Sequence, residues 1–508
     1  MNEPIVTIAQ MQAIESRMFA AGLPIAALME KVGGRISVRI QQLFPLTSYP
    51  RVGVVFGSGH NGGDALVVAR ELHWLGYEVM LYSPSDRFKD LTDQHYRYVT
   101  SVGIARVSSV AELAPCDVIV DGLFGFGLDR MLSPALVNTI AEINSLQLPI
   151  VSIDLPSGIH ANSGNLLGAA IQADYTLCLG LWKLAFAQDA SLLYLGHAEL
   201  VSFDIPPSDI QAVLGTPSPI EMMTQETADL YLPHQRPQVT HKYQQGHLLL
   251  IVGSWQYAGA AILAGLGARA SGVGLLSIAV PHSLKLAVLQ ALPDAIVIGC
   301  PETGQGAIAR LPDVNPSKYT AVAVGCGLTT EPIALIESLL DWDLPLILDA
   351  DALNILATLP ADRWTDRSAG TVLTPHGGEW QRLFPTESNP AESINRLTNT
   401  IEKAAQTNTV LLRKGTRTIV SNGLKTWVIN NGTPALARGG SGDVLTGLIG
   451  GLIATAQTQP TNPDLINIVA SANWWHAQAG SQAAQARGVS GVDAVTLTRY
   501  LAPAIAHL

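Results

Sequence analysis

The sequence has few cysteines and few charged residues. Its four cysteines, Cys116, Cys178, Cys300 and Cys326, are far apart and show no CxxC spacing, so neither a disulfide framework nor a zinc site is expected. Only 14% of the residues are charged, and the net charge is -11. Proteins that bind nucleic-acid backbones carry basic faces, so we expect no nucleic-acid partner. The cysteine pattern fits a reducing, cytoplasmic environment.

The sequence also lacks a long apolar run. The N-terminal segment MNEPIVTIAQ has no basic stretch followed by an apolar one, which is the pattern of a secretory signal. The most apolar segment, residues 444–456, is shorter than the ~20 residues that a membrane-spanning helix needs, and glycines interrupt it. We therefore expect a buried helix there, and no membrane partner.

Apolar and small residues are abundant instead. The chain has 508 residues, of which 48% are hydrophobic and 46 are glycines. Such a chain is too long for a single core, and the composition is typical of well-packed α/β enzymes. We expect two domains.

Strand-like and helical segments alternate in both halves of the chain. Residues 11–44 predict one or two helices, 52–56 a strand and 65–75 a helix. The remaining strands of the first half are predicted at 78–82, 117–120, 150–153 and 175–179. The second half predicts a helix at 258–270 and strands at 247–252, 273–280, 321–324, 346–348, 372–373, 410–412 and 418–420. This alternation indicates parallel βαβ units, and we expect a Rossmann-like three-layer domain in the first half.

A proline-rich segment interrupts the alternation. Residues 203–224 contain DIPPSDIQAVLGTPSPIEMMT, where prolines favour extended or turn conformations over helix. We place the first domain at residues 1–212, a linker at 213–224 and the second domain at 225–508. The halves show no evident repeat, which predicts a fusion of two different α/β domains.

The first glycine-rich loop, GSGHNGGD at residues 57–64, follows the strand at 52–56. A turn of this kind lets backbone N–H groups and a helix N-terminus approach an anion. It lacks the GxGxxG fingerprint and the GK[ST] of a P-loop, and it contains the polar residues Asn61 and Asp64. The alternative is that the loop is a tight structural turn that binds no ligand.

Two further loops follow strands, DGLFGFGLDR from Asp121 and SIDLPSGI around Asp154. Open α/β sheets bind ligands at such strand ends, so Asp121, Asp154 and Ser157 are expected to converge with Asn61. A ligand set with few carboxylates and many neutral oxygens would fit a monovalent cation better than Mg²⁺. A helix cap is as good an explanation for either aspartate taken alone.

These three motifs together resemble the NAD(P)H-hydrate epimerase domain, over residues 1 to about 212. The resemblance implies interconversion of the R and S forms at C6 of hydrated NAD(P)H, K⁺ held near Asn61, Asp121 and Ser157, and Asp154 as the acid–base residue. One departure from the family pattern is Ala65, where a further glycine is usual. The implied substrate contacts are His60, Asn61, Gly62, Gly63, Asp64, Gly125, Phe126, Gly127, Leu128, Asp129, Arg130, Met131 and Asp154.

The second glycine-rich motif is ALARGGSGDVLTGLIGG, in which Gly439, Gly440 and Gly442 precede a helix. Their N–H groups can form an anion hole for a transferring phosphoryl group. Asp443 follows at the helix N-terminus, where the helix dipole favours its ionised form and thus its use as a base. An ordinary helix cap is the alternative for Asp443.

This motif resembles the ribokinase-like superfamily. With TPHGGEW, LLRKGTRTIV, DADALN and VGSWQYAGAA, residues 225–508 resemble the ADP- or ATP-dependent NAD(P)H-hydrate dehydratase domain. The resemblance implies that a nucleotide with Mg²⁺ phosphorylates the C6 hydroxyl of the S hydrate and that phosphate then leaves. It implies Asp443 as catalytic base and nucleotide contacts at Lys414, Gly415, Thr416, Arg417, Thr418 and Gly442. The implied hydrate contacts are Ala260, Gly327, His376 and Asp443.

Three residues depart from the dehydratase pattern. Tyr243 stands where glycine is usual, Thr433 where asparagine is common and Arg438 where threonine is frequent. None removes a proposed catalytic group, although Arg438 could change how the anion hole meets the nucleotide.

Two other functions are compatible with the motifs. The C-terminal domain could be a vitamin or sugar kinase with an accessory N-terminal binding domain, or the N-terminal domain could be a non-catalytic scaffold. The retained Asp121, Asp154 and NGGD argue against a scaffold. No residue decides between ADP and ATP or between NADH and NADPH hydrate. We expect a homo-oligomer, although the sequence gives no interface.

Overall fold

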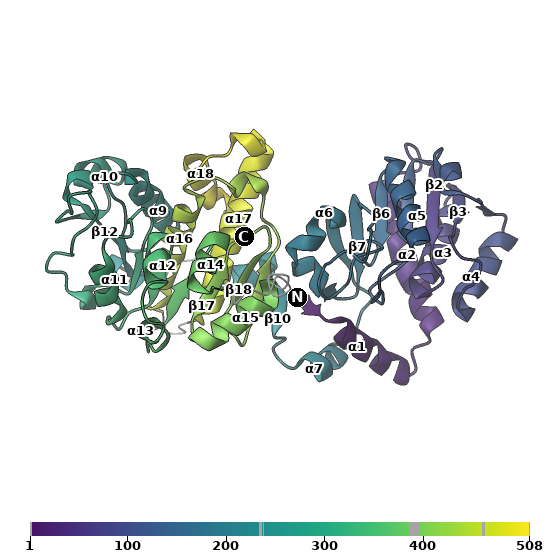
Figure 1. The fold of residues 1–508 in the computed structure, drawn as a ribbon, viewed down its shortest axis with the longest axis horizontal. Helices are drawn as coiled ribbons and strands as arrows, with labels where there is room; N and C mark the ends of the chain where they lie inside the picture. Colours follow the sequence, from purple (N-terminus) through teal and green to yellow (C-terminus); the bar gives the residue numbers. More distant parts are fainter. Residues whose placement is uncertain (1–2, 233–235, 237, 386–395, 460–462, 507–508) are drawn as a thin grey trace. The chain divides into compact units, whose positions relative to one another are not determined.

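The computed structural model describes residues 3–232, 236, 238–385, 396–459 and 463–506. The chain divides into two compact units, Glu3–Pro219 and Ile220–Leu508, each a mixed α/β structure (Figure 1). The predicted α/β class is confirmed in both units. In the described part of the chain, no helix is long and apolar enough to cross a membrane.

The first unit is built on a parallel sheet with the strand order β4-β3-β2-β5-β6-β7-β9. Three predicted strands are confirmed with the same bounds. The central strands are buried along nearly their whole length, as expected for a parallel sheet covered by helices on both faces. The strands are β2 (Arg51–Phe56), β3 (Glu78–Tyr82), β4 (Ala105–Arg106), β5 (Val118–Gly122), β6 (Ile150–Ile153), β7 (Tyr175–Leu179) and β9 (His197–Val201).

The helix after β2 starts earlier than predicted. Helix α3 (His60–Trp74) begins at His60, so HNGGD forms its first turn rather than a loop ahead of it. The glycines permit this, because a Cβ on Gly62 would lie 2.0 Å from the Gly57 carbonyl oxygen. The first turn of α3 therefore packs directly against the end of β2.

Prolines in the segment 203–224 do not prevent a helix, contrary to our expectation. Helix α7 (Pro207–Leu214) starts with Pro207 in its first turn, where the missing N–H leaves no hydrogen bond unmade. Ile220–Met222 forms β10, which pairs in parallel with β19 (Thr426–Ile429).

Helix α2 (Ile25–Leu43) holds α3 in place through a close approach at Gly33. A Cβ on Gly33 would lie 2.4 Å from Val67 Cγ1, whereas a Cβ on its neighbour Gly34 would meet nothing within 4 Å. These adjacent glycines in one helix form a matched pair for testing the α2–α3 packing.

We expect Gly33→Ala to lower the free energy of unfolding by about 1–3 kcal/mol, because the added methyl overpacks the helix interface. Gly34→Ala should instead raise it by up to about 1 kcal/mol, because alanine favours helix without a clash. Urea unfolding of the two variants beside the wild type measures both changes. Equal effects of the two substitutions would contradict this description of the interface.

The second unit has the strand order β13-β12-β11-β14-β15-β16-β17-β18-β19-β10. Its pairs are parallel except β17–β18 and β18–β19, which are antiparallel. The predicted helix α9 (Ala258–Ala270) and strand β14 (Ala321–Val324) are confirmed with the same bounds. The other strands are β11 (His247–Ile251), β12 (Leu275–Pro281), β13 (Ile296–Cys300), β15 (Leu346–Leu348), β16 (Thr371–Leu373), β17 (Val410–Arg413) and β18 (Thr418–Ser421).

The predicted buried helix is α16 (Ser441–Ala456), whose residues from Val444 to Ala456 are all buried. It packs closely on α9, since a Cβ on Gly447 would lie 1.8 Å from the Ala264 carbonyl oxygen. Helix α17 (Leu465–Arg487) packs beside α16 and is also largely buried. The small residues of α16 thus allow close packing on α9, in addition to the glycines that form the turn before the helix.

Candidate functional site

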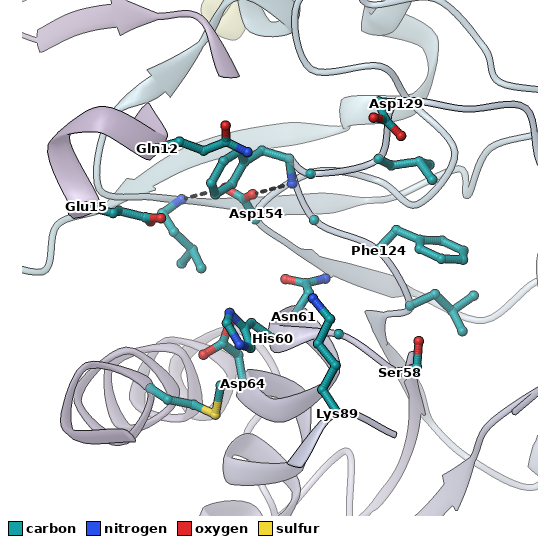
Figure 2. Close-up of a pocket in the computed structure, with 18 of the residues that line it drawn as sticks. Gln12, Glu15, Ser58, His60, Asn61, Asp64, Lys89, Phe124, Asp129 and Asp154 are labelled. Carbon is teal, nitrogen blue, oxygen red and sulfur yellow. Dashed lines mark hydrogen bonds between the residues drawn. The ribbon is translucent and has the colours of Figure 1, made fainter. Parts of the chain in front are cut away.

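The first unit contains a cavity of about 850 Å³ at the carboxyl ends of β2, β5 and β6. Figure 2 shows Glu15 and Asp154 on one side of it, facing His60, Asn61 and Asp64 on α3. Gly62 and Gly63 do not line the cavity, because they pack against Gly57 and the Met29 side chain. The residues singled out from the sequence that do line it are His60, Asn61, Asp64, Gly125, Phe126, Gly127, Leu128, Asp129, Arg130, Met131 and Asp154.

Asp154 directly follows β6 in a left-handed backbone conformation, with φ of 68°. A residue other than glycine costs energy in this conformation, so the surrounding structure must hold it there. Its side chain is buried; Oδ2 accepts a hydrogen bond from Phe126 N at 2.9 Å and Oδ1 one from Leu179 N at 3.3 Å. The carboxylate is therefore fixed in orientation at the wall of the cavity.

Lys183 is the ion-pair partner of Asp154, and none of the sequence motifs predicted it. It lies on β8 (Trp182–Lys183), is fully buried, and places Nζ 2.5 Å from Asp154 Oδ1 and 2.6 Å from the Leu179 carbonyl oxygen. Burial opposes the charge of the ammonium group, but the Asp154 carboxylate outweighs it, and the pKa of Lys183 is raised. A lysine within the apolar stretch LGLWKLAFA was the available signal.

Two more carboxyl groups lie close to this pair. Burial raises the pKa of Glu15 to about 7, against the effect of Lys183 and with a further contribution from Asp154. Burial, together with Asp154 and Glu15, raises the pKa of Asp64 well above its ordinary value. The cavity wall therefore combines the anchored Asp154 side chain with two carboxyl groups whose pKa values are raised by burial.

Asp121 and Ser157 meet below the loop that follows β5. Ser157 Oγ donates to Asp121 Oδ1 at 2.6 Å, and Ser157 N and Ser152 Oγ donate to Oδ2 at 2.9 and 2.8 Å. Burial raises the pKa of Asp121, and these hydrogen bonds oppose that rise. The carboxylate is thus stabilised largely by neutral donors.

Asn61 approaches the same loop from α3. Its backbone oxygen lies 3.1 Å from the position of a Cβ on Gly122, and its Oδ1 lies 3.1 Å from that of a Cβ on Gly125. Asn61 Nδ2 is buried and has no hydrogen-bond partner within the described ranges. Asn61, Asp121 and Ser157 thus surround one loop, but only Asn61 lines the cavity.

In the second unit, Asp443 lies in the first turn of α16, after Gly440, whose φ of 91° is left-handed. The N–H groups of a first helical turn have no partner within the helix, so they are available to an anion. Burial and the nearby Asp349 raise the pKa of Asp443 to about 6. A carboxyl group with this pKa can accept and release a proton near neutral pH.

Asp349 is buried beside Asp443 and contacts Lys414 and Thr446. It is the first residue of the DADALN motif, but it was not predicted as a site residue. Its Oδ1 is 2.6 Å from Lys414 Nζ, and its Oδ2 accepts from Thr446 Oγ1 at 2.5 Å. Burial alone would raise the pKa of Asp349, but Lys414 and Thr446 lower it. Lys414 Nζ is also 3.3 Å from the position of a Cβ on Gly442, so a side chain there would crowd the lysine.

The remaining residues singled out in the second unit lie in α9, in the loop after β14, and in the turn from β17 into β18. Gly327, with φ of 64°, would place a Cβ 2.9 Å from Ala260 Cβ, so these two residues are neighbours. Gly415, Thr416 and Arg417 connect β17 to Thr418, the first residue of β18. Arg417 donates to the Asn430 carbonyl oxygen at 2.7 Å.

His376 caps helix α14 (Gly377–Leu383). Its Nδ1 accepts from Gly378 N at 3.0 Å, and its Nε2 lies 3.2 Å from Glu379 Oε1. The side chain is 56% exposed, so the ring remains accessible to a ligand while it caps the helix.

The three departures from the family pattern have local explanations. Tyr243 is 67% exposed, and Thr433 caps a short helix by accepting from Ala435 N at 3.3 Å. Arg438 donates to the Ser490 carbonyl oxygen at 2.7 Å. Arg438 is thus tied to the segment before α18 (Ala494–Ile505).

Comparisons with known proteins agree with the motifs. Residues 248–503 match the family model described as NAD(P)H-hydrate dehydratase, and residues 25–185 match that described as YjeF-related protein N-terminus. The bifunctional NAD(P)H-hydrate repair enzyme Nnr of Synechocystis sp. is 50% identical over 504 residues, covering 98% of this chain and 94% of that protein. The Thermosynechococcus vestitus enzyme of the same name is 49% identical, covering 99% and 97%.

A solved structure also resembles the second unit. The ADP/ATP-dependent NAD(P)H-hydrate dehydratase from Bacillus subtilis, co-crystallised with ATP and Mg²⁺, is 31% identical, with a TM-score of 0.47. The match covers 56% of this chain and 96% of that one.

Proposed function

Since this chain belongs to the family of bifunctional NAD(P)H-hydrate repair enzymes, we propose that its two units repair hydrated NAD(P)H in succession. Residues 1–212 interconvert the R and S hydrates, and residues 225–508 convert the S hydrate back to NAD(P)H at the expense of a nucleotide. The observation that carries the proposal is the presence, on one chain, of the Asp154 cavity and the GGSGD turn with Asp443.

The epimerase step requires proton transfer at C6, which carries a hydroxyl group beside the ring nitrogen. Asp154 Oδ2 accepts one hydrogen bond from Phe126 N, which leaves the oxygen able to accept a substrate proton. Lys183 and the Leu179 N–H hold Oδ1 and fix the carboxylate. Asp154 is therefore the acid–base residue of this proposal, and the cavity residues from Gly125 to Met131 bind the substrate with His60, Asn61 and Asp64.

Potassium would be held by Asn61, Asp121 and Ser157. The donor set fits a monovalent ion, because one carboxylate is joined by neutral oxygens. The unpaired Asn61 Nδ2 supports this, since no protein hydrogen bond in the described segments fixes the amide group against turning its oxygen to an ion. A bound cation would stabilise negative charge and order the loop from Gly122 to Gly125.

The dehydratase step uses the nucleotide with Mg²⁺ as co-substrate. Asp443 takes the proton of the C6 hydroxyl, the hydroxyl oxygen attacks the terminal phosphoryl group, and the anion hole of Gly439, Gly440 and Gly442 stabilises the transferring charge. The terminal P–O bond of the nucleotide breaks, and the nucleotide leaves one phosphate shorter. The C6–O bond then breaks with its electron pair on phosphate, which leaves more readily than hydroxide, and loss of a proton from C5 restores the ring double bond. Lys414, with residues 415–418, binds the nucleotide, while Ala260, Gly327 and His376 bind the hydrate.

We expect the purified chain, given mixed R and S hydrate, Mg²⁺ and ADP or ATP, to restore the full absorbance of the reduced cofactor. Full recovery requires both activities, because the dehydratase accepts one stereoisomer only. Recovery that stops near the S fraction would contradict the epimerase assignment, and none with either nucleotide would contradict the dehydratase assignment. Repeating the assay in Na⁺ and K⁺ buffers tests the cation. A homo-oligomer remains a prediction, which light scattering tests.

A further inference from the structure

Glu15 lines the cavity and has no part in the proposed function. It lies on α1 (Ile8–Ala20), three residues before Met18 and four after Met11, which are both buried. Residues at these spacings share a helix face, so Glu15 lies on the face that packs inward. Its side chain is among those that line the cavity, on the same side as Asp154 (Figure 2).

The position of Glu15 is fixed by contacts at the start of α1. Thr7 and Gln10 form a capping box, in which Gln10 N donates to Thr7 Oγ1 at 3.1 Å and Thr7 N to Gln10 Oε1 at 2.9 Å. Ile8 N donates to Asn162 Oδ1 at 2.8 Å. The capping box fixes the first turn of α1, and the bond to Asn162 ties that turn to the loop after β6, so Glu15 is presented to the cavity by an anchored helix.

Several charged groups surround Glu15, but in the described part of the chain none of them forms a hydrogen bond with its carboxyl group. Lys183 on β8 and Asp154 at the end of β6 act on the charge of Glu15, and Asp64 lies opposite on α3. On the α7 side, Arg17 and Asp209 pair with each other at 3.0 Å. Within the described residues, the Glu15 carboxyl group makes no hydrogen bond of its own, whereas Asp154 accepts three.

Epimerisation through opening of the ring needs two proton-transfer groups. One group takes the hydroxyl proton, the O–H electron pair forms the C6=O bond, and the pair of the broken C6–N1 bond goes to N1. A second group gives N1 a proton. After rotation of the aldehyde, N1 adds to its other face and both protons return, so the reaction balances without an oxidant or a net proton.

We propose that Glu15 is this second group, acting as the acid at N1 while Asp154 Oδ2 acts as the base at the C6 hydroxyl. The proposal rests on the proposed epimerase function and extends it to a helix outside the three loops. The raised pKa of Glu15, about 7, supports it, because near neutral pH such a group holds a proton and can still release it.

The test is Glu15→Gln in the full chain, assayed for equilibration of R and S hydrate between pH 5.5 and 9. We expect kcat to fall by about 10²-fold or more with KM little changed, because glutamine keeps the shape but cannot donate an acidic proton. The wild-type rate should decline above about pH 7, and this decline should be absent in the variant. Glu142→Gln, the same change at an exposed position of α5 (Pro134–Ser145), is the matched control.

Each alternative result is decisive. An unchanged rate in Glu15→Gln, or a reduced rate that keeps the decline above pH 7, overturns the catalytic role of Glu15. Loss of the decline in Asp64→Asn instead assigns the second group to Asp64 and overturns the proposal. An Asp154→Asn variant that keeps full epimerase activity contradicts the proposed site itself, which separates the failure of the two ideas.

Discussion

Asp154→Asn should lower the epimerase rate by about 10²- to 10⁴-fold, the range that a positioned general acid or base contributes. Asparagine tolerates the left-handed backbone conformation that Asp154 adopts, and its amide oxygen can still accept from Lys183. The substitution therefore removes the charge and the basic oxygen while keeping the shape. It also leaves the buried Lys183 without its carboxylate partner, so urea unfolding of the variant is measured beside its activity. The measurement is the rate of equilibration of pure R hydrate with S hydrate.

The dehydratase activity of the same variant is the internal control. It should convert S hydrate at the wild-type rate, because Asp443 lies in the other unit. Asp90→Asn, a matched change at an exposed residue in the first turn of α4 (Asp90–Ser101), should leave both activities intact. Wild-type equilibration by Asp154→Asn would remove Asp154 from the mechanism.

Asp443→Asn should lower the dehydratase rate by a similar factor, about 10²- to 10⁴-fold, because the hydroxyl group then loses its base. The amide keeps the size of the side chain at the N-terminus of α16. Epimerase activity should be unchanged, because its site lies in the other unit, and binding of the nucleotide by the variant shows that the second unit is folded. The measurement is restoration of reduced cofactor from S hydrate at saturating nucleotide.

The pH dependence of the wild-type dehydratase gives a second check on Asp443. A base must be ionised to act, and the pKa of Asp443 is raised to about 6. The rate should therefore be constant above this pH and fall about tenfold for each unit below it. A rate independent of pH down to 4.5 would show that Asp443 does not act as the base.

The sequence predicted the strands better than the starts of the helices. β3, β6 and β14 have the predicted bounds because each is a short apolar run between segments of helix length. α3 starts five residues earlier than predicted, because glycines usually indicate a loop, whereas here they let the first turn pack against Gly57. α7 was not predicted, because prolines usually favour extended or turn conformations, whereas Pro207 lies in a first helical turn, where proline fits.

The family assignment from the motifs is confirmed by the family models and the relatives, but motifs could not supply the whole site. Asp154 was visible because it follows a strand within a recognisable loop. Its partner Lys183 lies 29 positions further on in an apolar stretch, and Glu15 lies on a helix 139 positions before it. Their meeting depends on the packing of α1 and β8, which no local pattern encodes.

The ion pair of Lys183 and Asp154 constrains how this protein can evolve. Both groups are buried, so losing either one alone leaves an uncompensated charge, a loss that costs about 3–5 kcal/mol. A relative that has lost epimerase activity is therefore not free to change Asp154 alone, because that single substitution would destabilise the fold. Relatives without the activity should have substituted both Asp154 and Lys183, or retained both.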